Sequence, residues 1–519
     1  MLQKILLVLI IFLAFTLRVF KLGEVPSSLY WDEASLGYNA YSISQTLRDE
    51  HGEFLPVTRF IAFGDYKPVG YIYAAAASIK LFGLSEFSIR FPSALAGTLL
   101  ILITYFLAKE LFRNPNLALI ASALVAISPW SLQMSRGAFE ANLATLFSGT
   151  GILFFIKGVK NKSLSSYVLA SLFLILSMYT FNSHRVFVPL IIGALSIVFI
   201  KEIFNQKKRY ILFLISCFLF LLPLIPYFLN RESRLRFEEV SWTKDLAPIE
   251  ESNQRIALDS NNLFSKIIHN RRVSYTLQFL KHYSDHFRPD FLFYKGDVNL
   301  RLGTGGIGEM YWVELPFFLA GLYFLIKKRD KFSAFIFAWL LLAPIPAAMA
   351  RETPHALRFL NVLPIPQIIT AYGIFKLLNF KLLYLPLAII YLVFFGFYLH
   401  DYYVNYPVRS EMNWQSGYKE MVRHVASVEQ NYPCVNITQY YGRPYIYFLL
   451  YNQYPPQKYW SARKTDRDWY GFWYVHSFGK YSFDSSENKN CLYVSAPQET
   501  PKDVKIIYKT PVFVFYEKI

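Results

Sequence analysis

The chain has 519 residues, of which 54% are hydrophobic, 18% aromatic and only 17% charged. Soluble domains carry about a quarter charged residues, so this composition excludes an ordinary soluble globular protein and predicts a membrane protein. The formal net charge of +17 indicates cytoplasmic loops and contact with anionic lipid rather than nucleic-acid binding, because no basic run is interleaved with aromatic residues.

The first hydrophobic segment, Leu2 to Phe20, is predicted to be a retained membrane span. It lacks a small-residue cleavage site and is long for a signal-peptide core. The stretch that follows, Tyr30 to Leu36, predicts the start of a short helix with two adjacent carboxylates, Asp32 and Glu33.

The helical period places Asp32 on the apolar side of this short helix. At about 100° per residue, Asp32 shares a side with Leu36, Asn39, Ile43 and Leu47, and Glu33 points about a quarter-turn away. A carboxylate on the buried side of a membrane-surface helix is costly unless its charge is used. The alternative is a plain helix start, where acidic residues favour the positive end of the helix dipole.

Segments of about 17–25 apolar residues, long enough to cross a bilayer, number about eleven. They lie near residues 2–20, 92–108, 117–134, 138–156, 166–182, 185–201, 210–229, 311–326, 332–350, 356–375 and 381–400. The segment Val69–Leu84 is shorter, at about 16 residues, and contains Lys80. We interpret it as a short or re-entrant helix against the outer face, within an external loop at 21–91.

Four basic clusters orient these spans. They are Lys157 with Lys160 and Lys162, Lys201 with Lys207–Arg209, Lys327–Arg329 with Lys331, and Lys376 with Lys381. Placing all four in the cytoplasm gives one consistent alternation. It predicts a transmembrane domain at 1–400, with external loops at 21–91 and 230–310. The glycines at 303, 305, 306 and 308 give the second loop the freedom to close over a ligand; the alternative is a disordered linker.

Beyond Asp401 the hydrophobic runs shorten, and residues 401–519 predict a small α/β domain outside the membrane. Helices are expected at 415–430 and 444–451. Strands are expected at 435–439, 472–476, 492–495 and within 504–516. Cys434 and Cys491 each precede a strand, so either a disulfide or two free thiols fits. The absence of a CxxC or Cys/His cluster gives no reason to expect structural zinc. The predicted fold class is therefore mainly α: a polytopic membrane protein with external juxtamembrane helices and a C-terminal α/β domain.

This topology gathers charged and imidazole side chains at one membrane face. They are Asp32, Glu33, Asp65, Lys67, Arg90, Arg136, Glu140, His184, Arg185, Arg351, His355 and Arg358. Arg90 could instead snorkel to the interface, and Arg136 and Glu140, four residues apart, could simply pair. As a set they are suited to hold an anionic lipid headgroup while a carboxylate transfers a proton.

Several of these residues stand in a recognisable order. Tyr66-Lys67-Pro68 precedes Gly70-Tyr71-Ile72-Tyr73; Leu81-Phe82-Gly83 is followed by the run Glu86 to Gly97, and then by Ser128-Pro129 and Ser135-Arg136. With the acidic pair Asp32-Glu33, this order resembles the membrane-embedded glycosyltransferases of the GT-C superfamily. The resemblance is to the branch of protein O-mannosyltransferases and aminoarabinose transferases. It covers about residues 1–200 well and is looser in the later spans.

The chain departs from that pattern at three positions. Pro68 is followed by Val69 instead of a second proline, and Glu140 stands where the family usually has Asp. In some relatives a metal lies near the site, but here Asp65 is one step away from the position directly before the lysine. The resemblance therefore implies no certain cofactor and leaves a divalent metal as an open alternative.

The resemblance implies an inverting transfer of a sugar from a polyprenyl-phosphate donor to a hydroxyl of a protein, glycolipid or glycan. Asp32 would act as the general base, Glu33 would shape the site and Glu140 would orient Lys67 or a nearby cation. Lys67, Arg90 and Arg185 are the first candidates for the donor phosphate. The others are Arg136, His184, Arg351, His355 and Arg358. The expected location is a prokaryotic plasma membrane, with the site outside.

Two other classes compete with this interpretation. A lipid or solute transporter would need charged residues deep within several spans, whereas the middle of these spans is almost uncharged. A non-catalytic scaffold would leave Asp32 on its apolar stripe unexplained.

Overall fold

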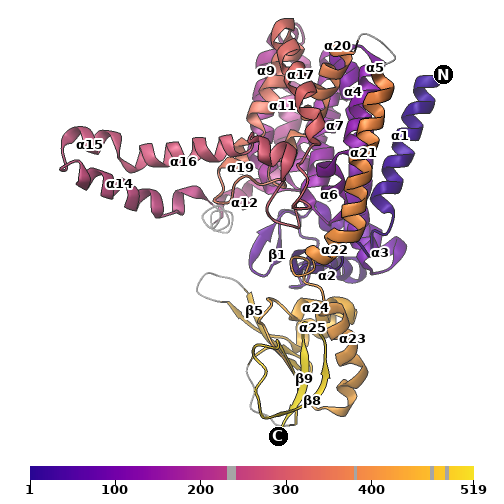
Figure 1. Ribbon diagram of the computed structural model, residues 1–519, viewed down its shortest axis with the longest axis vertical. Helices are drawn as coiled ribbons and strands as arrows, with labels where there is room; N and C mark the ends of the chain where they lie inside the picture. The colour runs from indigo at the N-terminus through magenta and orange to yellow at the C-terminus, as the bar shows by residue number, and fades with distance from the viewer. Residues whose placement is uncertain (231–240, 379–382, 468–472, 485–489) are drawn as a thin grey trace. The chain divides into compact units, whose positions relative to one another are not determined.

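The computed structural model describes residues 1–230, 241–378, 383–467, 473–484 and 490–519. It divides into two compact units, each built from two stretches of the chain (Figure 1). The helical unit comprises Met1–Phe20 and Ser93–Tyr402, and the mixed unit comprises Lys21–Pro92 and Tyr403–Ile519. The loop predicted to be external, 21–91, thus packs with the C-terminal residues in one unit, which comprises Lys21–Pro92 and Tyr403–Ile519.

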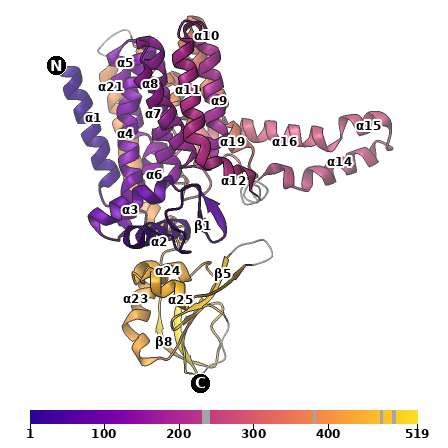
Figure 2. The same cartoon turned by 180° about the vertical axis from the view of Figure 1, so that it is seen from behind.

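The helical unit is a bundle of helices joined by short connections, with one longer excursion. Its helices are α1 (Leu2–Val19), most of α4 (Glu86–Phe112), α5 (Pro115–Ile127), α6 (Pro129–Arg136), α7 (Glu140–Asn161), α8 (Leu164–Met178), α9 (Asn182–Val198), α10 (Ile200–Phe204), α11 (Lys207–Leu221), α12 (Ile225–Leu229), α14 (Ala247–Leu258), α15 (Leu263–Ile268), α16 (Arg271–Asp285), α17 (Leu315–Lys328), α18 (Lys331–Leu342), α19 (Ile345–Ala348), α20 (Ile365–Leu377) and α21 (Tyr384–His400). Helices α14 to α16 form the excursion and lie within the region predicted as the second external loop (Figure 2).

Among the described residues, six helical runs are long and apolar enough to cross a membrane. They are Leu2–Val19, Glu86–Phe112, Glu140–Asn161, Lys207–Leu229, Lys331–Ala348 and Tyr384–Arg409. The pair α5 and α6, bent by 53° at Ser128, would make a seventh span, and α8 and α9 are shorter apolar helices. The chain is therefore an integral membrane protein.

Each of the predicted spans contains a helix, but the count of about eleven is not confirmed. Breaks shorten some of the segments. In the segment predicted at 356–375 the α-helix α20 begins only at Ile365, behind Pro364, because turns and the 3-10 helix Leu360–Val362 precede it. Hydropathy averages over such breaks, whereas the helix hydrogen-bond ladder does not.

The mixed unit begins with α2 (Trp31–Thr46), the strands β1 (Phe60–Ala62) and β2 (Asp65–Lys67), and α3 (Gly70–Phe82). Strands β1 and β2 form an antiparallel hairpin, in which Phe63 and Gly64 both have a positive φ. Helix α3 has 13 residues, too few to cross a bilayer. The prediction of a short helix within 69–84 is therefore correct.

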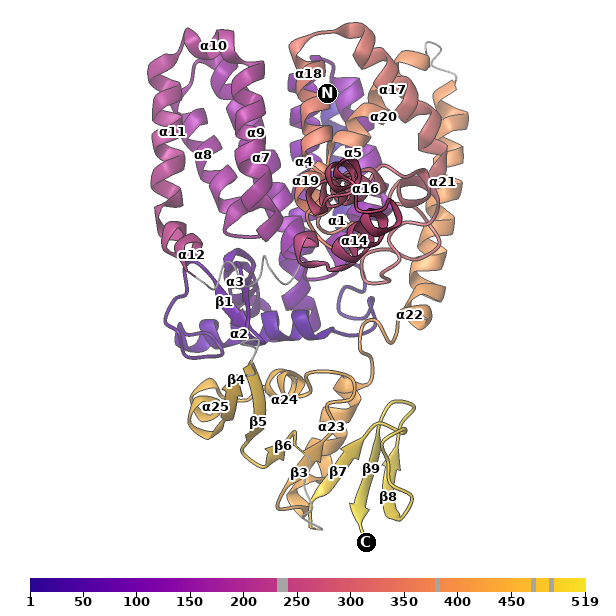
Figure 3. The ribbon, with the colours of Figure 1, turned by 90° about the vertical axis from the view of Figure 1, so that its left-hand side faces the viewer.

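The C-terminal part of the mixed unit is an α/β sandwich of one sheet and a few helices. The helices are α22 (Tyr406–Arg409), α23 (Tyr418–Val428), α24 (Tyr445–Tyr451) and α25 (Pro456–Ala462). The strands are β3 (Val435–Ile437), β4 (Lys464–Arg467), β5 (Trp473–Phe478), β6 (Tyr481–Ser482), β7 (Leu492–Ser495), β8 (Val504–Lys509) and β9 (Val514–Lys518). Their order is β4-β5-β6-β3-β7-β9-β8 (Figure 3). Strand β3 is parallel to β6 and β7, and the other pairs are antiparallel.

The predicted helices and strands of this region are present, with 504–516 divided into β8 and β9. Strands β4 and β6 and helix α25 were not predicted. Strand β4, Lys464-Thr465-Asp466-Arg467, is polar and mostly exposed, so it carries no apolar alternation that would identify it.

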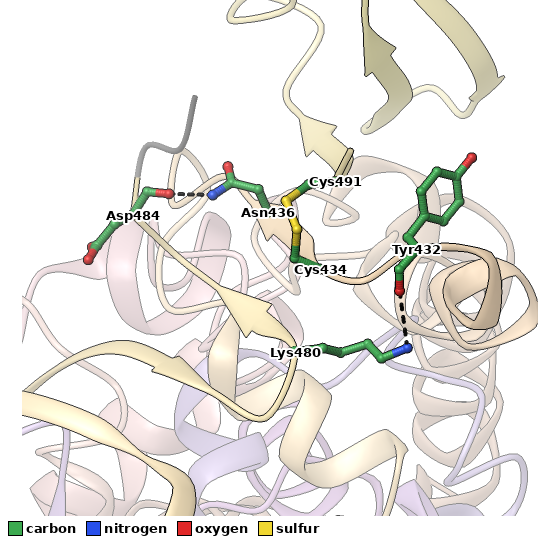
Figure 4. The surroundings of a disulfide bond; sticks show 6 residues. All are labelled: Tyr432, Cys434, Asn436, Lys480, Asp484 and Cys491. Carbon is green, nitrogen blue, oxygen red and sulfur yellow. Dashed lines mark hydrogen bonds between the residues drawn. A yellow bond between two sulfur atoms is a disulfide. The ribbon is translucent and has the colours of Figure 1, made fainter. Parts of the chain in front are cut away.

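A disulfide links Cys434 and Cys491 at the amino ends of the neighbouring strands β3 and β7 (Figure 4). The sequence left this pairing open against two free thiols. Parallel strands bring the two residues together, because Val435 is directly opposite Leu492 in the sheet register. Near the disulfide, Lys480 donates to the Tyr432 carbonyl, and Asn436 donates to the Asp484 carbonyl.

Removing this disulfide is expected to destabilise the mixed unit. The bond closes a loop with a sequence separation of 57 residues, so replacing both cysteines with serine should cost about 2–4 kcal/mol of unfolding free energy. Thermal unfolding of the purified full-length protein, with and without reductant, measures this effect. A serine variant of the free thiol, Cys217, is the control. The prediction is wrong if the wild-type protein has the same melting temperature as the double variant and reductant does not change that temperature.

Candidate active site

The acidic pair opens helix α2 in the mixed unit, as predicted. Tyr30 is the N-cap in an extended conformation, and Asp32 and Glu33 lie in the first helical turn. Their carboxylates favour that end of the helix dipole, but each also has a specific basic partner. The helix-start interpretation is therefore confirmed, and the site interpretation stays a prediction.

Asp32 pairs with Lys67. The Nζ of Lys67 lies 2.5 Å from Oδ1 of Asp32, and the two side chains are 13% and 31% exposed. Lys67 ends strand β2, so the β1–β2 hairpin carries its ammonium to the first turn of α2. The Tyr66-Lys67-Pro68 motif thus meets the acidic pair across 35 residues of sequence.

The burial of the two carboxylates is the reverse of the prediction. Glu33 is fully buried and Asp32 is the partly exposed one. The prediction that Asp32 faces the apolar side and Glu33 points away from it is therefore wrong. It assumed one buried side, whereas α2 packs against both α3 and α24 and buries most of its circumference.

Glu33 is neutralised by Arg90, which is also fully buried. The guanidinium donates Nε–H to Glu33 Oε1 at 3.0 Å and Nη2–H to Oε2 at 2.9 Å. Its remaining donors reach the carbonyls of Leu22 at 3.2 Å, Pro26 at 2.9 Å and Ser28. Arg90 also lies over the ring of Trp414, 5.4 Å from its centroid. With five acceptors already present, this guanidinium is suited to hold the loop and α2 in place rather than to bind a lipid phosphate.

A second acidic cluster in the mixed unit was not predicted. Asp49 and Glu50 are fully buried in the turn after α2, and His51 stacks on Trp473 with ring centroids 5.2 Å apart. The Glu50 carboxylate accepts a hydrogen bond from the Asn39 amide at 3.2 Å. The backbone carbonyl of Glu50 accepts hydrogen bonds from the side chains of Trp460 and Arg463. The cluster therefore anchors the turn at 49–51 to the C-terminal residues of the unit.

Burial shifts the titration of this cluster. It raises the pKa of Glu50 to about 7 and that of Asp49 to about 6, and it lowers the pKa of His51 to about 3. A carboxyl whose pKa is raised on folding binds its proton more tightly in the folded state. The contribution of Glu50 to stability is therefore present below about pH 4.5 and is lost as the pH rises towards 7. The contribution of His51 to stability has the opposite dependence on pH: it is present above about pH 6.5 and is lost as the pH falls below that value.

The difference in stability between Glu50→Gln and wild type is expected to depend on pH. Glutamine cannot ionise. The free energy of unfolding of the variant should therefore rise relative to that of the wild type by up to about 3 kcal/mol as the pH rises from 5 to 7.5. Comparing the two proteins cancels the contribution of His51. Thermal unfolding at several pH values measures the difference, with Glu24→Gln, an exposed carboxylate of the same unit, as the control. A difference that does not change with pH would contradict the prediction.

In the helical unit, Arg136 joins α6 to the end of α1. Its Nη1–H donates to the carbonyl of Leu17 at 2.7 Å and to that of Arg18 at 3.3 Å, and its Nε–H donates to the Tyr402 hydroxyl. The guanidinium also lies over the Tyr402 ring. Arg136 is buried, and these acceptors favour a framework role.

Arg18, inside the first predicted span, is the reciprocal partner and was not singled out from the sequence. It is fully buried and donates to the carbonyls of Val125 and Ala126 at the end of α5, and to the hydroxyls of Ser131 and Ser135 in α6. The bend between α5 and α6 leaves those carbonyls without their helical donors. Arg18 therefore supplies hydrogen-bond donors to the carbonyls that are left open where α5 ends.

Glu140, His184 and Arg185 lie at helix starts of the helical unit. Glu140 is buried in the first turn of α7. His184, in the first turn of α9, is buried with its Nε2 3.3 Å from the Ser148 hydroxyl. Arg185 donates to the Met178 carbonyl at 3.1 Å and lies 4.6 Å from the ring centroid of Tyr227. Arg185 is thus held beside an aromatic ring, with a partly accessible side chain.

The predicted residues Arg351, His355 and Arg358 share the turn after α19. Arg351 donates to the Ser241 carbonyl at 3.3 Å. The backbone N–H of His355 donates to Nε2 of the buried His286, and the backbone N–H of Arg358 to Nδ1 of His355. Burial lowers the pKa of His355 well below its ordinary value, and that of His286 to about 4. Both imidazoles are therefore neutral at pH 7, so His355 offers a phosphate a hydrogen bond at most and no charge.

The predicted site residues thus fall into local groups within each unit. The mixed unit brings together Asp32 with Lys67 and Glu33 with Arg90. The helical unit brings together His355 and Arg358. Within the ranges that the structure describes, no group of three or more His, Cys, Asp or Glu side chains is arranged to hold a metal ion. We therefore derive no step through a metal.

One protein family matches part of the chain. Residues 66–227 match the family described as dolichyl-phosphate-mannose-protein mannosyltransferase. The match begins beside Lys67 and includes Arg90, Arg136, Glu140 and Arg185. No curated protein matches the chain significantly.

Solved structures extend the likeness to the whole chain. ArnT from Cupriavidus metallidurans bound to undecaprenyl phosphate is similar with a TM-score of 0.58 at 10% identity, over 99% of this chain and 98% of that one. Its apo state gives a TM-score of 0.59 at 11% identity, over 99% and 97%. The chain therefore has the ArnT fold, and the resemblance to the GT-C mannosyltransferase and ArnT-like branch is confirmed.

An archaeal enzyme is also similar. The oligosaccharyltransferase of Archaeoglobus fulgidus in complex with Zn and sulfate gives a TM-score of 0.50 at 13% identity, over 86% of this chain and 61% of that one. The present chain spans less than two thirds of the length of that enzyme.

Proposed function

We propose that this protein is a GT-C glycosyltransferase that moves a sugar from a polyprenyl-phosphate donor to a hydroxyl acceptor, with inversion at the anomeric carbon. The observation that carries the proposal is the contact between Lys67 and Asp32, 2.5 Å apart at the start of α2. It brings Asp32, the proposed base, next to Lys67, the proposed phosphate-binding cation, in a chain with the ArnT fold. The solved ArnT was bound to undecaprenyl phosphate, and this is the donor class we carry over.

Before the donor binds, the ammonium of Lys67 balances the charge of Asp32. A phosphate monoester or diester competes for that ammonium, because charge-assisted hydrogen bonds to phosphate oxygens are strong. When Lys67 turns to the phosphate, its hold on the Asp32 carboxylate weakens and the carboxylate can accept a proton. Donor binding thus prepares the base.

The transfer then balances as follows. Asp32 takes the proton of the acceptor hydroxyl, and the acceptor oxygen attacks the anomeric carbon from the face opposite the phosphate. The bond between that carbon and the phosphate oxygen breaks, and the lipid phosphate leaves with the electron pair. Lys67 stabilises the negative charge on the leaving phosphate. The sequence also predicts Arg185, Arg351 and Arg358, in the helical unit, as phosphate ligands.

The remaining predicted residues have supporting roles in this proposal. Glu33 and Arg90 fix the first turn of α2 and therefore the position of Asp32. Arg136 fixes the α1–α6 contact, and Glu140 begins the next helix, α7, four residues later. The acceptor is a protein, glycolipid or glycan hydroxyl at the outer membrane face. The proposed site and the C-terminal α/β region would both lie outside the cytoplasm.

Replacing Lys67 with glutamine is expected to weaken donor binding about tenfold or more, because one charge-assisted contact of about 1.5–3 kcal/mol is lost. Photocrosslinking of the reconstituted full-length protein to a photoreactive polyprenyl phosphate, competed with unlabelled lipid, measures the affinity. Lys80→Gln is the matched control, since Lys80 is an exposed cation of the same unit. Unchanged crosslinking in Lys67→Gln, or an equal loss in Lys80→Gln, would overturn the role of Lys67.

A further inference from the structure

The excursion of the helical unit is a helical hairpin with an apolar tip. Helices α14 and α16 run alongside one another, and α15 forms the end far from the bundle, as both Figure 1 and Figure 2 show. Polar contacts hold the hairpin closed: Tyr275 donates to the Asp245 carbonyl at 2.9 Å, and Ser252 donates to the His269 carbonyl. The hairpin is therefore an ordered arm.

The arm is fixed at the end of a membrane-crossing run. That run, Lys331–Ala348, is followed at once by Ala350, which forms a β-bridge with Ser241 at the root of the arm. The other side of the root is tied to the same turn, because the Thr353 hydroxyl donates to Asp285 at 2.9 Å. Both sides of the arm thus leave the bundle at one boundary of a span, and the arm extends crosswise to the long helices (Figure 1).

The tip exposes a continuous apolar face. Leu263, Phe264, Ile267 and Ile268 occupy neighbouring positions around α15 and are 40–77% exposed. Leu258, just before them, is 84% exposed. Ser265, on the opposite side of α15, is buried. The helix therefore turns its apolar side out and buries only Ser265, the reverse of the pattern of a helix in water.

Basic side chains border this face. Lys266, Arg271 and Arg272 are exposed at the tip, and the acidic residue there, Asp259, is paired with His269 at 3.2 Å. Exposed apolar side chains bordered by cations are typical of helices that lie in the interface of a membrane with anionic lipids. The exposed apolar residues of α11, among them Phe218 and Leu219, already present a lipid-facing surface in the same unit.

We propose that the α14–α16 arm lies on the membrane crossed by the helical unit and inserts the apolar face of α15 into the lipid interface. The root fixes the arm at the level of a span boundary, so the tip reaches lipid without a change of fold. This function is independent of the sugar transfer proposed above.

Site-directed fluorescence tests the proposal. In a Cys217→Ser background, Phe264→Cys carries an environment-sensitive fluorophore, and the full-length protein is placed in nanodiscs of phosphatidylcholine and phosphatidylglycerol. We expect a blue-shifted emission and strong quenching by nitroxide-labelled phosphatidylcholine. The same fluorophore at Gln254→Cys, an exposed polar position of α14, should be quenched by aqueous iodide instead.

Two outcomes would overturn the proposal. Quenching of the Phe264→Cys fluorophore by iodide but not by lipid nitroxide would place the tip in water. Protection from both quenchers would place it against protein, such as a second copy of the chain, and nanodiscs that hold a single copy would then lose this protection. A double variant, Phe264→Ser with Ile267→Ser, should melt as wild type in detergent yet lose lipid quenching of a fluorophore at Leu258→Cys.

Discussion

Replacing Asp32 with asparagine is expected to abolish sugar transfer and to leave the fold and donor binding intact. An amide is nearly the same size as a carboxylate but cannot accept the proton of the acceptor hydroxyl, and a positioned general base contributes about 10²–10⁴-fold to the rate. Because the pair with Lys67 is only partly buried, its loss should cost about 1 kcal/mol or less of stability.

Donor binding separates this prediction from a structural effect. In Asp32→Asn, the contact of Lys67 with the Asp32 carboxylate is weakened, so crosslinking to polyprenyl phosphate should be equal to or stronger than in wild type. Transfer is measured in vesicles that contain the donor lipid, with Glu24→Gln as a control for the removal of one carboxylate. Transfer near the wild-type rate by Asp32→Asn would exclude Asp32 as the base, and loss of binding would assign it to the framework.

Replacing Arg90 with methionine is expected to destabilise the mixed unit by about 3–5 kcal/mol. The change leaves the Glu33 carboxylate buried without a counter-charge and removes the donor to the carbonyls of Leu22, Pro26 and Ser28. Glu33→Gln should cost less, because an amide oxygen still accepts from Arg90.

The double variant Glu33→Leu with Arg90→Met is the informative control. It removes the uncompensated charge, so it should be more stable than Arg90→Met alone, although the three carbonyls remain without their donor. Chemical denaturation of the purified protein measures all three variants. If Arg90→Met melts like wild type, or if the double variant is the least stable of the three, the buried pair is not the anchor of α2.

The sequence predicted most of the helices and the α/β region, but not the contact between Asp32 and Lys67. Hydropathy identifies helical segments because an apolar stretch must bury its backbone within a helix. It could not count the spans, since breaks such as that at Ser128 do not alter the average. The disulfide could not be chosen either, because the register of β3 and β7 is a tertiary property.

The roles within the acidic pair could not be assigned from periodicity. A helical wheel gives the direction of Glu33 relative to Asp32, but it does not say that α3 and α24 cover α2 from two sides. Glu50 illustrates the same limit, since its carbonyl is bonded by Arg463 from 413 positions away in the sequence. From its sequence alone, a turn such as Asp49-Glu50-His51 would be expected to be exposed to solvent, because its distant partner is not known.

The motif that carries the resemblance is explained by packing. A Cβ added at Gly97 would lie 1.9 Å from the Ser135 hydroxyl, so glycine lets α4 approach α6 closely. Ser93 donates to the Met134 carbonyl and accepts from Asn142. The Ser135-Arg136 pair and the Ser93–Gly97 run therefore belong to one contact between α4 and α6.

The placement of Arg18 has a consequence for the order in which the protein assembles. A guanidinium inside the earliest hydrophobic stretch is poorly tolerated by hydrocarbon alone. Apart from the Ala14 carbonyl in α1 itself, its acceptors belong to residues more than a hundred positions later. During synthesis, α1 therefore gains most of the hydrogen-bond partners of Arg18 only after α5 and α6 have been made. Helix α1 is therefore synthesised early but completes its packing late.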